Sequence, residues 1–88
     1  MFINKSKDGR NNLCGIHVAQ RRKQMNKSQR ELADMLQLAG LDVDKNAVQR
    51  IEAGKRFVTD IELKVIAKTL NIPIEELVRA ESDEVKSE

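Results

Sequence analysis

The sequence predicts a single all-α domain, and three observations support that class. Its 88 residues allow one small domain and little more. Hydrophobic residues make up 40% of the chain, with two Phe and no Trp or Tyr, so Leu, Ile, Val, Ala and Met must build the core. Valine and isoleucine are scattered singly and no run alternates apolar and polar residues for long, which argues against strands. We expect a compact arrangement of five short helices.

The first helix is expected to run from near Asn12 to about Met25. Four residues at helical spacing form one stripe on it: Cys14, Val18, Arg22 and Met25. An arginine in a core stripe is unusual, because a buried guanidinium requires an anionic partner. Asn26 can adopt the left-handed conformation that ends a helix.

The second helix is expected between two local signals. Ser28 and Glu31 have the spacing of a capping box, in which each side chain binds the other residue's backbone N–H. Gly40 ends the helix after about Ala39. The side chains expected to face inwards are Leu32, Ala33, Leu36 and Ala39. Val43, in the following connection, is expected to fill the gap before the third helix.

The third helix is expected within residues 44–54. Asp44 can accept a hydrogen bond from the first turn, and Gly54 can end the helix in a left-handed conformation. The inward stripe contains Val48, Ile51 and Glu52, so it places a carboxylate where the first helix places a guanidinium. We therefore predict an ion pair between Arg22 and Glu52; the alternative is two unrelated surface charges.

The outward face of this third helix is rich in hydrogen-bond donors: Lys45, Asn46, Gln49 and Arg50. Such side chains suit contact with phosphates and base edges in a DNA groove. Residues 1–58 hold 12 Lys or Arg against 6 Asp or Glu, whereas residues 59–88 hold 4 against 8. A basic front and an acidic back favour a polyanionic partner. An ordinary solvated helix face is the alternative.

The last two helices are expected at about 60–70 and 73–78. Thr59 and Glu62 match a second capping box, Asn71 can end the longer helix, and Pro73 suits the first turn of the shorter one. The residues expected to be buried are Ile61, Val65 or Ile66, Leu70, Ile74 and Leu77, with Phe57 or Val58 packed beneath the longer helix. Residues 1–12 are predicted to be a flexible leader, and residues 79–88 an acidic disordered tail.

Several classes of protein are disfavoured by the composition. One cysteine allows no internal disulfide, and His17 is expected to be a lone surface imidazole without a second metal ligand. Cys14 is interpreted as a small core residue. The N-terminus resembles no signal peptide and no apolar run approaches about 18 residues, so we expect a soluble cytoplasmic protein. The chain has no Gly-rich phosphate loop or nucleophile–base pair, so no enzyme and no cofactor are expected.

The spacing of the helices resembles the Cro/repressor, or XRE-type, helix-turn-helix domains, which have a lambda-repressor-like fold. The resemblance covers about residues 13–78. The residues that carry it are Arg22, Ser28, Gln29, Leu32, Ala33, Val48, Ile51, Glu52, Gly54, Lys55, Ile66, Ala67, Leu70, Asn71, Ile72 and Leu77. The chain departs from the pattern by about five extra residues, Gln37–Leu41, which lengthen the second helix and put the docking angle of the third in question. Lys27, where members often have an apolar residue, is a smaller departure.

The resemblance implies roles for individual residues. The base-contacting residues would be Lys45, Asn46, Ala47, Gln49 and Arg50, on a helix spanning residues 44–53. The phosphate-contacting residues would be Gln29, Arg30, Lys55 and Arg56. Arg22 and Glu52 match the family's buried ion pair, in agreement with the stripe argument above.

Two functions are therefore considered for this chain. The first is a sequence-specific DNA-binding transcriptional regulator, a repressor in style, that binds double-stranded DNA as a homodimer on two half-sites. The face around Leu77 and Val78 is the candidate dimer surface, and a regulatory protein partner is possible. The second function is a protein-interaction module of the same fold, such as an antitoxin that neutralises a partner protein.

Overall fold

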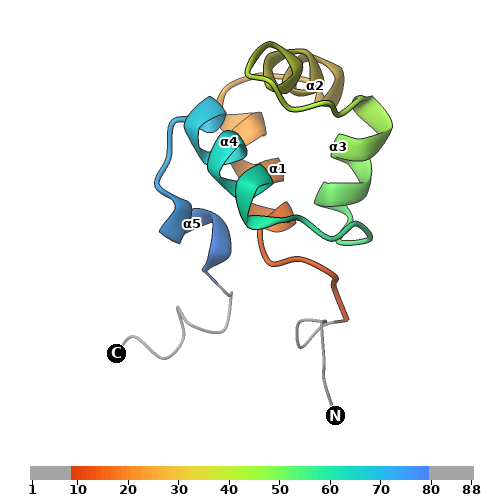
Figure 1. Cartoon of the computed structure of the whole chain (residues 1–88), viewed down its shortest axis with the longest axis vertical. Helices are drawn as coiled ribbons and strands as arrows, with labels where there is room; N and C mark the ends of the chain where they lie inside the picture. The colour runs from red at the N-terminus through yellow and green to blue at the C-terminus, as the bar shows by residue number, and fades with distance from the viewer. Residues whose placement is uncertain (1–8, 80–88) are drawn as a thin grey trace.

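The computed structural model describes residues 9–79, and within them the chain forms five helices and no strand (Figure 1). The helices are α1 (Gly15–Gln24), α2 (Gln29–Leu38), α3 (Lys45–Glu52), α4 (Asp60–Leu70) and α5 (Ile74–Val78). The all-α prediction is confirmed. Most of the predicted flexible leader (residues 1–12) and of the predicted acidic tail (residues 79–88) lies outside the described residues.

Helix α1 lies at the centre of the arrangement and contacts α3, α4 and α5. Helices α2 and α3 pack against each other on one side, and α5 closes the opposite side (Figure 1). The buried apolar side chains form one cluster: Cys14, Val18, Leu32, Ala33, Leu36, Val43, Val48, Ile51, Ile66, Ala67, Leu70 and Leu77. A single core therefore holds all five helices.

The helix ends follow the local signals of the sequence. The Ser28–Glu31 and Thr59–Glu62 capping boxes are both formed, with both reciprocal hydrogen bonds present. Asn26 and Asn71 adopt positive φ angles of 59° and 60° at the ends of α1 and α4. These caps satisfy backbone groups that a helix leaves unpaired at its termini, and they are confirmed as predicted.

Three predicted core positions are wrong. Ile61 is 72% exposed, because Ile66 of the same helix faces the core and a separation of five residues turns Ile61 about 140° away from it. Ile74, the first residue of α5, is 40% exposed, whereas Leu77 is fully buried. Ala39 is exposed because it follows the last residue of α2. In the connection before α4, Val58 packs against the core and Phe57 does not.

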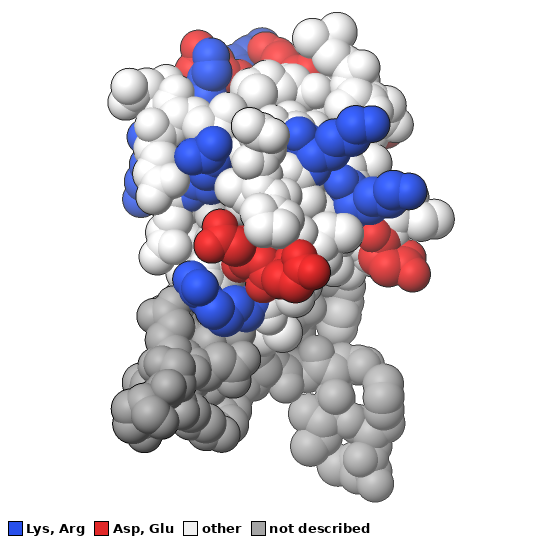
Figure 2. All heavy atoms as spheres, turned by 90° about the vertical axis from the view of Figure 1, so that its left-hand side faces the viewer, with Lys and Arg blue, Asp and Glu red and all other residues white. Residues whose placement is uncertain are grey.

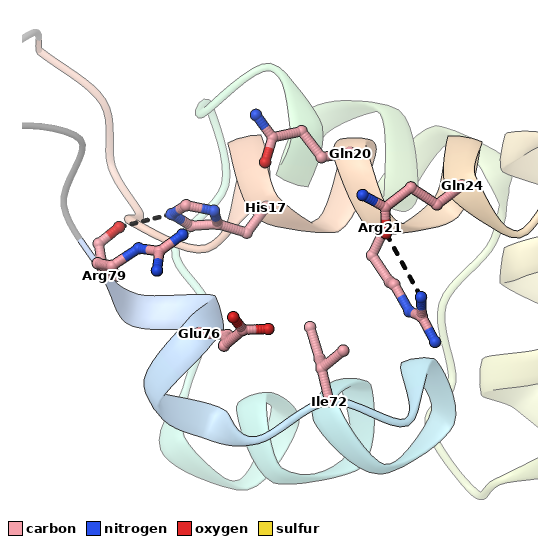
Figure 3. A pocket seen from close by; sticks show the side chains of 7 residues that line it. All are labelled: His17, Gln20, Arg21, Gln24, Ile72, Glu76 and Arg79. Atoms are coloured by element: carbon pink, nitrogen blue, oxygen red, sulfur yellow. Dashed lines mark hydrogen bonds between the residues drawn. The ribbon is translucent and has the colours of Figure 1, made fainter. Parts of the chain in front are cut away.

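His17 is buried rather than a surface imidazole, so that prediction is wrong. Only 7% of the residue is exposed, and its Nε2 atom lies 2.5 Å from the carbonyl oxygen of Arg79, at the end of α5 (Figure 3). His17 also lines a small polar pocket between α1 and α5, together with Gln20, Arg21, Gln24, Ile72, Glu76 and Arg79. Among the described residues, no group of three or more His, Cys, Asp or Glu could hold a metal ion.

The acidic back expected from the charge distribution is weak in the folded part of the chain. Residues 59–79 hold 3 Lys or Arg against 4 Asp or Glu, so most of the acidic excess falls after residue 79. Accordingly, the face that carries α5 shows a group of acidic side chains with Lys and Arg on either side (Figure 2). None of the described helices is long and apolar enough to cross a membrane.

Candidate nucleic-acid interface

Helix α3 divides cleanly into a buried and an exposed face. Val48 and Ile51 are 1% and 2% exposed and pack in the core. The donor-bearing residues predicted to contact bases, Lys45, Asn46, Gln49 and Arg50, are all exposed. Ala47 is half-buried against the core, so only part of its surface is open. The structure thus gathers four of the five predicted residues on one solvent-facing helix surface.

The N-terminal end of α3 is fixed by its cap and by the connection from α2. The carboxylate of Asp44 accepts a hydrogen bond from the Ala47 backbone N–H at 2.8 Å, as predicted. Val43 is 2% exposed, and its carbonyl accepts a hydrogen bond from the Gln37 side chain at 2.7 Å. These contacts anchor the segment that joins α2 to α3.

A surface hollow lies between α2 and the start of α3. Its lining residues are Arg30, Ala33, Asp34, Gln37, Asp44, Lys45 and Asn46. The hollow brings Arg30, predicted to contact phosphate, next to Lys45 and Asn46, predicted to contact bases. Asp34 and Asp44 border the same hollow, so the cationic surface is interrupted by two carboxylates.

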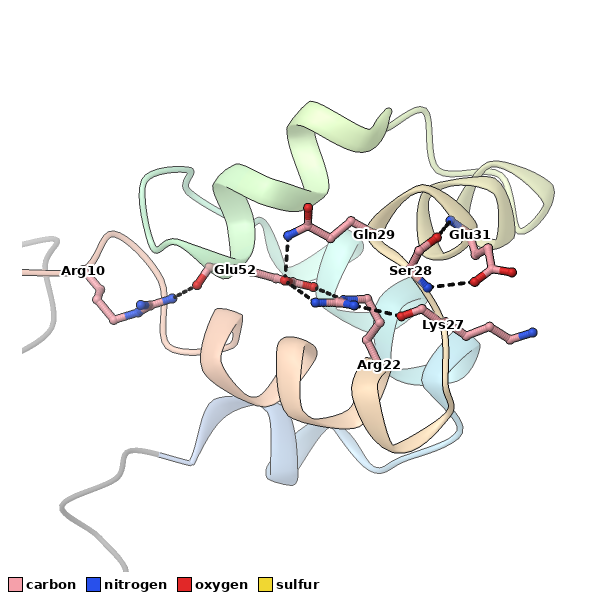
Figure 4. Close-up of polar contacts among 7 residues, drawn as sticks. All are labelled: Arg10, Arg22, Lys27, Ser28, Gln29, Glu31 and Glu52. Atoms are coloured by element: carbon pink, nitrogen blue, oxygen red, sulfur yellow. Dashed lines mark hydrogen bonds and ion pairs between the residues drawn. The ribbon is translucent and has the colours of Figure 1, made fainter.

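The predicted ion pair between Arg22 and Glu52 is confirmed. Arg22 Nε lies 2.7 Å from Glu52 Oε2, and Arg22 Nη2 donates to Oε1 at 3.1 Å (Figure 4). The two side chains are 12% and 8% exposed. Donating these hydrogen bonds to the Glu52 carboxylate raises the pKa of the Arg22 guanidinium. Arg22 also donates to the Lys27 carbonyl at 2.8 Å, so one guanidinium joins α1, the α1–α2 turn and α3.

Gln29 takes part in the same network. Its Nε2 atom donates to Glu52 Oε1 at 3.0 Å, which links the first residue of α2 to the inner face of α3 (Figure 4). One of the two amide hydrogens of Gln29 therefore binds Glu52, and the predicted phosphate contact would use the other. The contact itself remains a prediction.

The two predicted phosphate-binding residues after α3 differ in their surroundings. Lys55 is exposed. Arg56 pairs with Glu62 through its two terminal nitrogens, Nη1 at 3.1 Å and Nη2 at 2.9 Å, and Nη1 also donates to the Phe57 carbonyl. That pairing raises the pKa of Arg56 and lowers the pKa of Glu62. Arg56 is thus engaged within the protein, and Lys55 offers the freer charge.

Sequence reasoning missed the role of the residues just before α1. Residues 1–12 were predicted to be a flexible leader, whereas in the structure Arg10, Asn11 and Asn12 hydrogen-bond the end of α3 and the loop that follows it. Arg10 Nη2 donates to the Glu52 carbonyl at 2.7 Å, and Asn12 Nδ2 donates to the Ile51 carbonyl at 3.1 Å. Because these contacts join residues about 40 positions apart, no local pattern of the sequence signals them.

Comparisons with known proteins agree with this architecture. A crystal structure of the hypothetical transcription factor NHTF from Neisseria superposes with a TM-score of 0.71 at 17% sequence identity, covering 98% of this chain and 93% of that one. No curated protein matches the chain. Residues 18–77 match the helix-turn-helix family, and this range includes the whole of α2 and α3. As the resemblance predicted, the chain belongs to the helix-turn-helix family of the XRE type.

Proposed function

We propose that this chain is a sequence-specific DNA-binding transcriptional regulator that inserts α3 into the major groove. The observation that supports it best is the outward face of α3, where Lys45, Asn46, Gln49 and Arg50 are exposed while the inner face is held by the core and by Glu52. Amide side chains suit adenine edges, and an arginine suits a guanine edge. The proposed role is binding rather than catalysis.

Phosphate contacts would supply much of the affinity, from Arg30 on one side of α3 and Lys55 on the other. Both side chains are exposed, and Arg30 lines the hollow beside Lys45. The membership of the chain in the helix-turn-helix family and the transcription-factor description of its structural neighbour support the same function. A repressor action follows if the bound site overlaps a promoter.

A homodimer on two half-sites about 34 Å apart belongs to this proposal, because one domain reads only a few base pairs. The surface expected around Leu77 must be revised, since that side chain is fully buried within the protomer. Val78 is half-buried and Ile74 is 40% exposed, so α5 keeps only a small apolar surface for such a contact.

The test begins with selection of bound sequences from a random duplex pool, which returns a site and any half-site spacing. Affinity for that site is then measured over a range of salt concentrations. We expect Arg50→Ala and Gln49→Ala each to weaken binding by about 1–3 kcal/mol and to relax specificity at a base position. Lys68→Ala, which removes an exposed charge on α4, is the matched control and should bind as the unaltered protein does. No measurable affinity for any duplex at low salt would contradict the proposal.

One observation favours the second function, a module that binds a partner protein. Leu38, the last residue of α2, is 90% exposed. Single exposed apolar residues are common on protein surfaces, however, so this evidence is weaker than the donor-rich face of α3. The salt titration separates the two functions, because only the first requires an affinity for DNA that falls steeply with salt.

A further inference from the structure

Residues 10–12 cover the C-terminal end of α3. Arg10 Nη2 donates to the Glu52 carbonyl at 2.7 Å (Figure 4). The same nitrogen lies 3.5 Å from the Ile51 carbonyl. Asn12 Nδ2 donates to the Ile51 carbonyl at 3.1 Å. The last carbonyls of a helix have no i+4 partner within it and carry the negative end of its dipole, so a guanidinium placed there is favourable.

The same short segment also holds the loop that follows α3. The Asn11 backbone N–H donates to the Gly54 carbonyl at 2.8 Å, and its side-chain amide donates to the Lys55 carbonyl at 3.2 Å. Asn12 Nδ2 donates to the Arg56 carbonyl at 2.7 Å. Two consecutive asparagines therefore bind three consecutive carbonyls of the loop that carries Lys55.

Two glycines make room for this contact. A Cβ atom on Gly15 would lie 2.1 Å from the Ile51 oxygen and 2.4 Å from Arg10 Nη2. Gly54 has a φ of +78°, and a Cβ atom there would lie 2.7 Å from Arg10 Cζ. The guanidinium of Arg10 therefore lies in a space that exists because both neighbouring positions lack side chains.

We propose that Arg10 and Asn12 are positioning residues for DNA recognition: they set the pose of the last turn of α3 and of the loop that carries Lys55. This inference rests on the proposed function. The N-terminal end of α3 has its own anchor in the Asp44 cap, so the hydrogen bonds from residues 10–12 complete its attachment at the other end. Arg50, in the last turn of α3, would then meet the duplex in a fixed orientation.

A positioning role differs from a phosphate contact in a measurable way. A residue that binds phosphate weakens all sequences about equally when removed and lowers the salt slope by about 1. A residue that acts only through the pose of α3 changes the preference for the selected site over a random duplex and leaves the salt slope unchanged. Arg10 points its Nη2 donor at backbone carbonyls, which favours the second behaviour.

The experiment measures the ratio of affinities for the selected and a random duplex, together with the salt slope. For Arg10→Ala we expect the ratio to fall about tenfold, which corresponds to the loss of one charge-assisted hydrogen bond, with the slope unchanged. Arg10→Lys, which keeps the charge and a donor nitrogen, should restore part of the ratio. Lys55→Ala is the contrasting control, because it should lower the slope and leave the ratio unchanged.

Asn12 offers a second variant if Arg10→Ala fails to fold. Asn12→Asp keeps the Oδ1 acceptor that binds the Gly15 N–H at 2.8 Å, but it turns a carboxylate towards the carbonyls of Ile51 and Arg56. We therefore expect Asn12→Asp to lower the affinity ratio while the Gly15 N–H keeps its acceptor. Hydrogen exchange supplies a readout independent of DNA: the Gly54 and Lys55 amides should exchange faster in these variants, while that of Leu36 in the core stays unchanged.

An unchanged ratio in both Arg10→Ala and Asn12→Asp would overturn the inference, and so would a lower salt slope for Arg10→Ala at an unchanged ratio. Failure of the unaltered protein to bind any duplex at low salt would instead overturn the proposed function. In that case the exchange rates of Gly54 and Lys55 decide whether residues 10–12 hold α3, and unchanged rates count against it.

Discussion

Gly15 lies so close to Ile51 that no side chain fits between the two helices they belong to: a Cβ atom on Gly15 would lie 2.1 Å from the Ile51 carbonyl oxygen. Because that oxygen belongs to the backbone, α1 and the end of α3 must move apart to admit even a methyl group. The close approach is therefore a direct consequence of a glycine at position 15.

Gly15→Ala should accordingly destabilise the fold, although alanine is the better helix former by about 1 kcal/mol. Overpacking of this kind costs about 1–3 kcal/mol. Because the added methyl group would meet a backbone atom, we expect this cost to exceed the gain in helix propensity, so the free energy of unfolding should fall. Urea unfolding followed by circular dichroism measures it. Gln20→Ala, on the exposed side of α1, is the control and should be nearly neutral; equal stability of the Gly15 variant and the unaltered protein would contradict the prediction.

Removing one member of the Arg22–Glu52 pair should lower the free energy of unfolding by about 3–5 kcal/mol, because the remaining charge stays buried. Chemical unfolding of Arg22→Ala and Glu52→Ala tests this. The double variant Arg22→Met/Glu52→Leu should lose less than the sum of the two single losses, since it leaves no buried charge behind. Lys23→Ala, at the neighbouring exposed position, should change stability by no more than about 0.5 kcal/mol. Additive losses would show that the two charges act independently.

The contribution of the Arg56–Glu62 pair should depend on pH. Hydrogen bonding to Arg56 lowers the pKa of Glu62 below its ordinary value of 4.5. The pair's stabilisation is therefore fully present above that ordinary value, and it is lost as the pH falls through the lower pKa of the folded state. The difference in unfolding free energy between the unaltered protein and Glu62→Gln should be largest near about pH 7 and shrink towards about pH 3. A difference that stays constant over this range would argue against the pair.

Cys14 should resist alkylation in the folded protein. Burial raises the pKa of its thiol to about 11, and the residue is 1% exposed. Both effects suppress the thiolate that reacts with iodoacetamide. Mass spectrometry at mildly alkaline pH should show slow modification in buffer and fast modification in urea, so that the thiol reports unfolding. Comparable rates in both conditions would mean that the N-terminal end of α1 opens readily.

Much of the fold was predictable because its signals are local. The boxes at Ser28 and Thr59 satisfy their own helix ends with residues three positions apart, so the sequence pattern and the hydrogen bonds coincide. The Arg22–Glu52 pair is not local, but each partner stood as a charge in an otherwise apolar stripe. Two opposite charges in apolar stripes can be predicted to pair even when the packing of the helices is unknown.

Burial at the edges of helices was harder to predict. Ile61 belongs to a capped helix, yet the rotation of α4 in the core selects Ile66 and turns Ile61 to solvent. His17 lies three residues after Cys14, is buried, and hydrogen-bonds the Arg79 carbonyl at the end of α5. The sequence spacing admits either orientation, and contacts between helices decide which one occurs.

By itself, the sequence determined that helix α3 exists, where it begins and ends, and which of its sides is apolar, because caps and helical periodicity act within a few residues. Only the tertiary structure decided how that helix is held. Arg10 and Asn12 bind its C-terminal carbonyls from about 40 residues away, and Gly15 admits the approach. A backbone carbonyl can accept a hydrogen bond whatever side chain its residue carries. The sequence of α3 therefore does not indicate that its carbonyls are bound by residues 10–12.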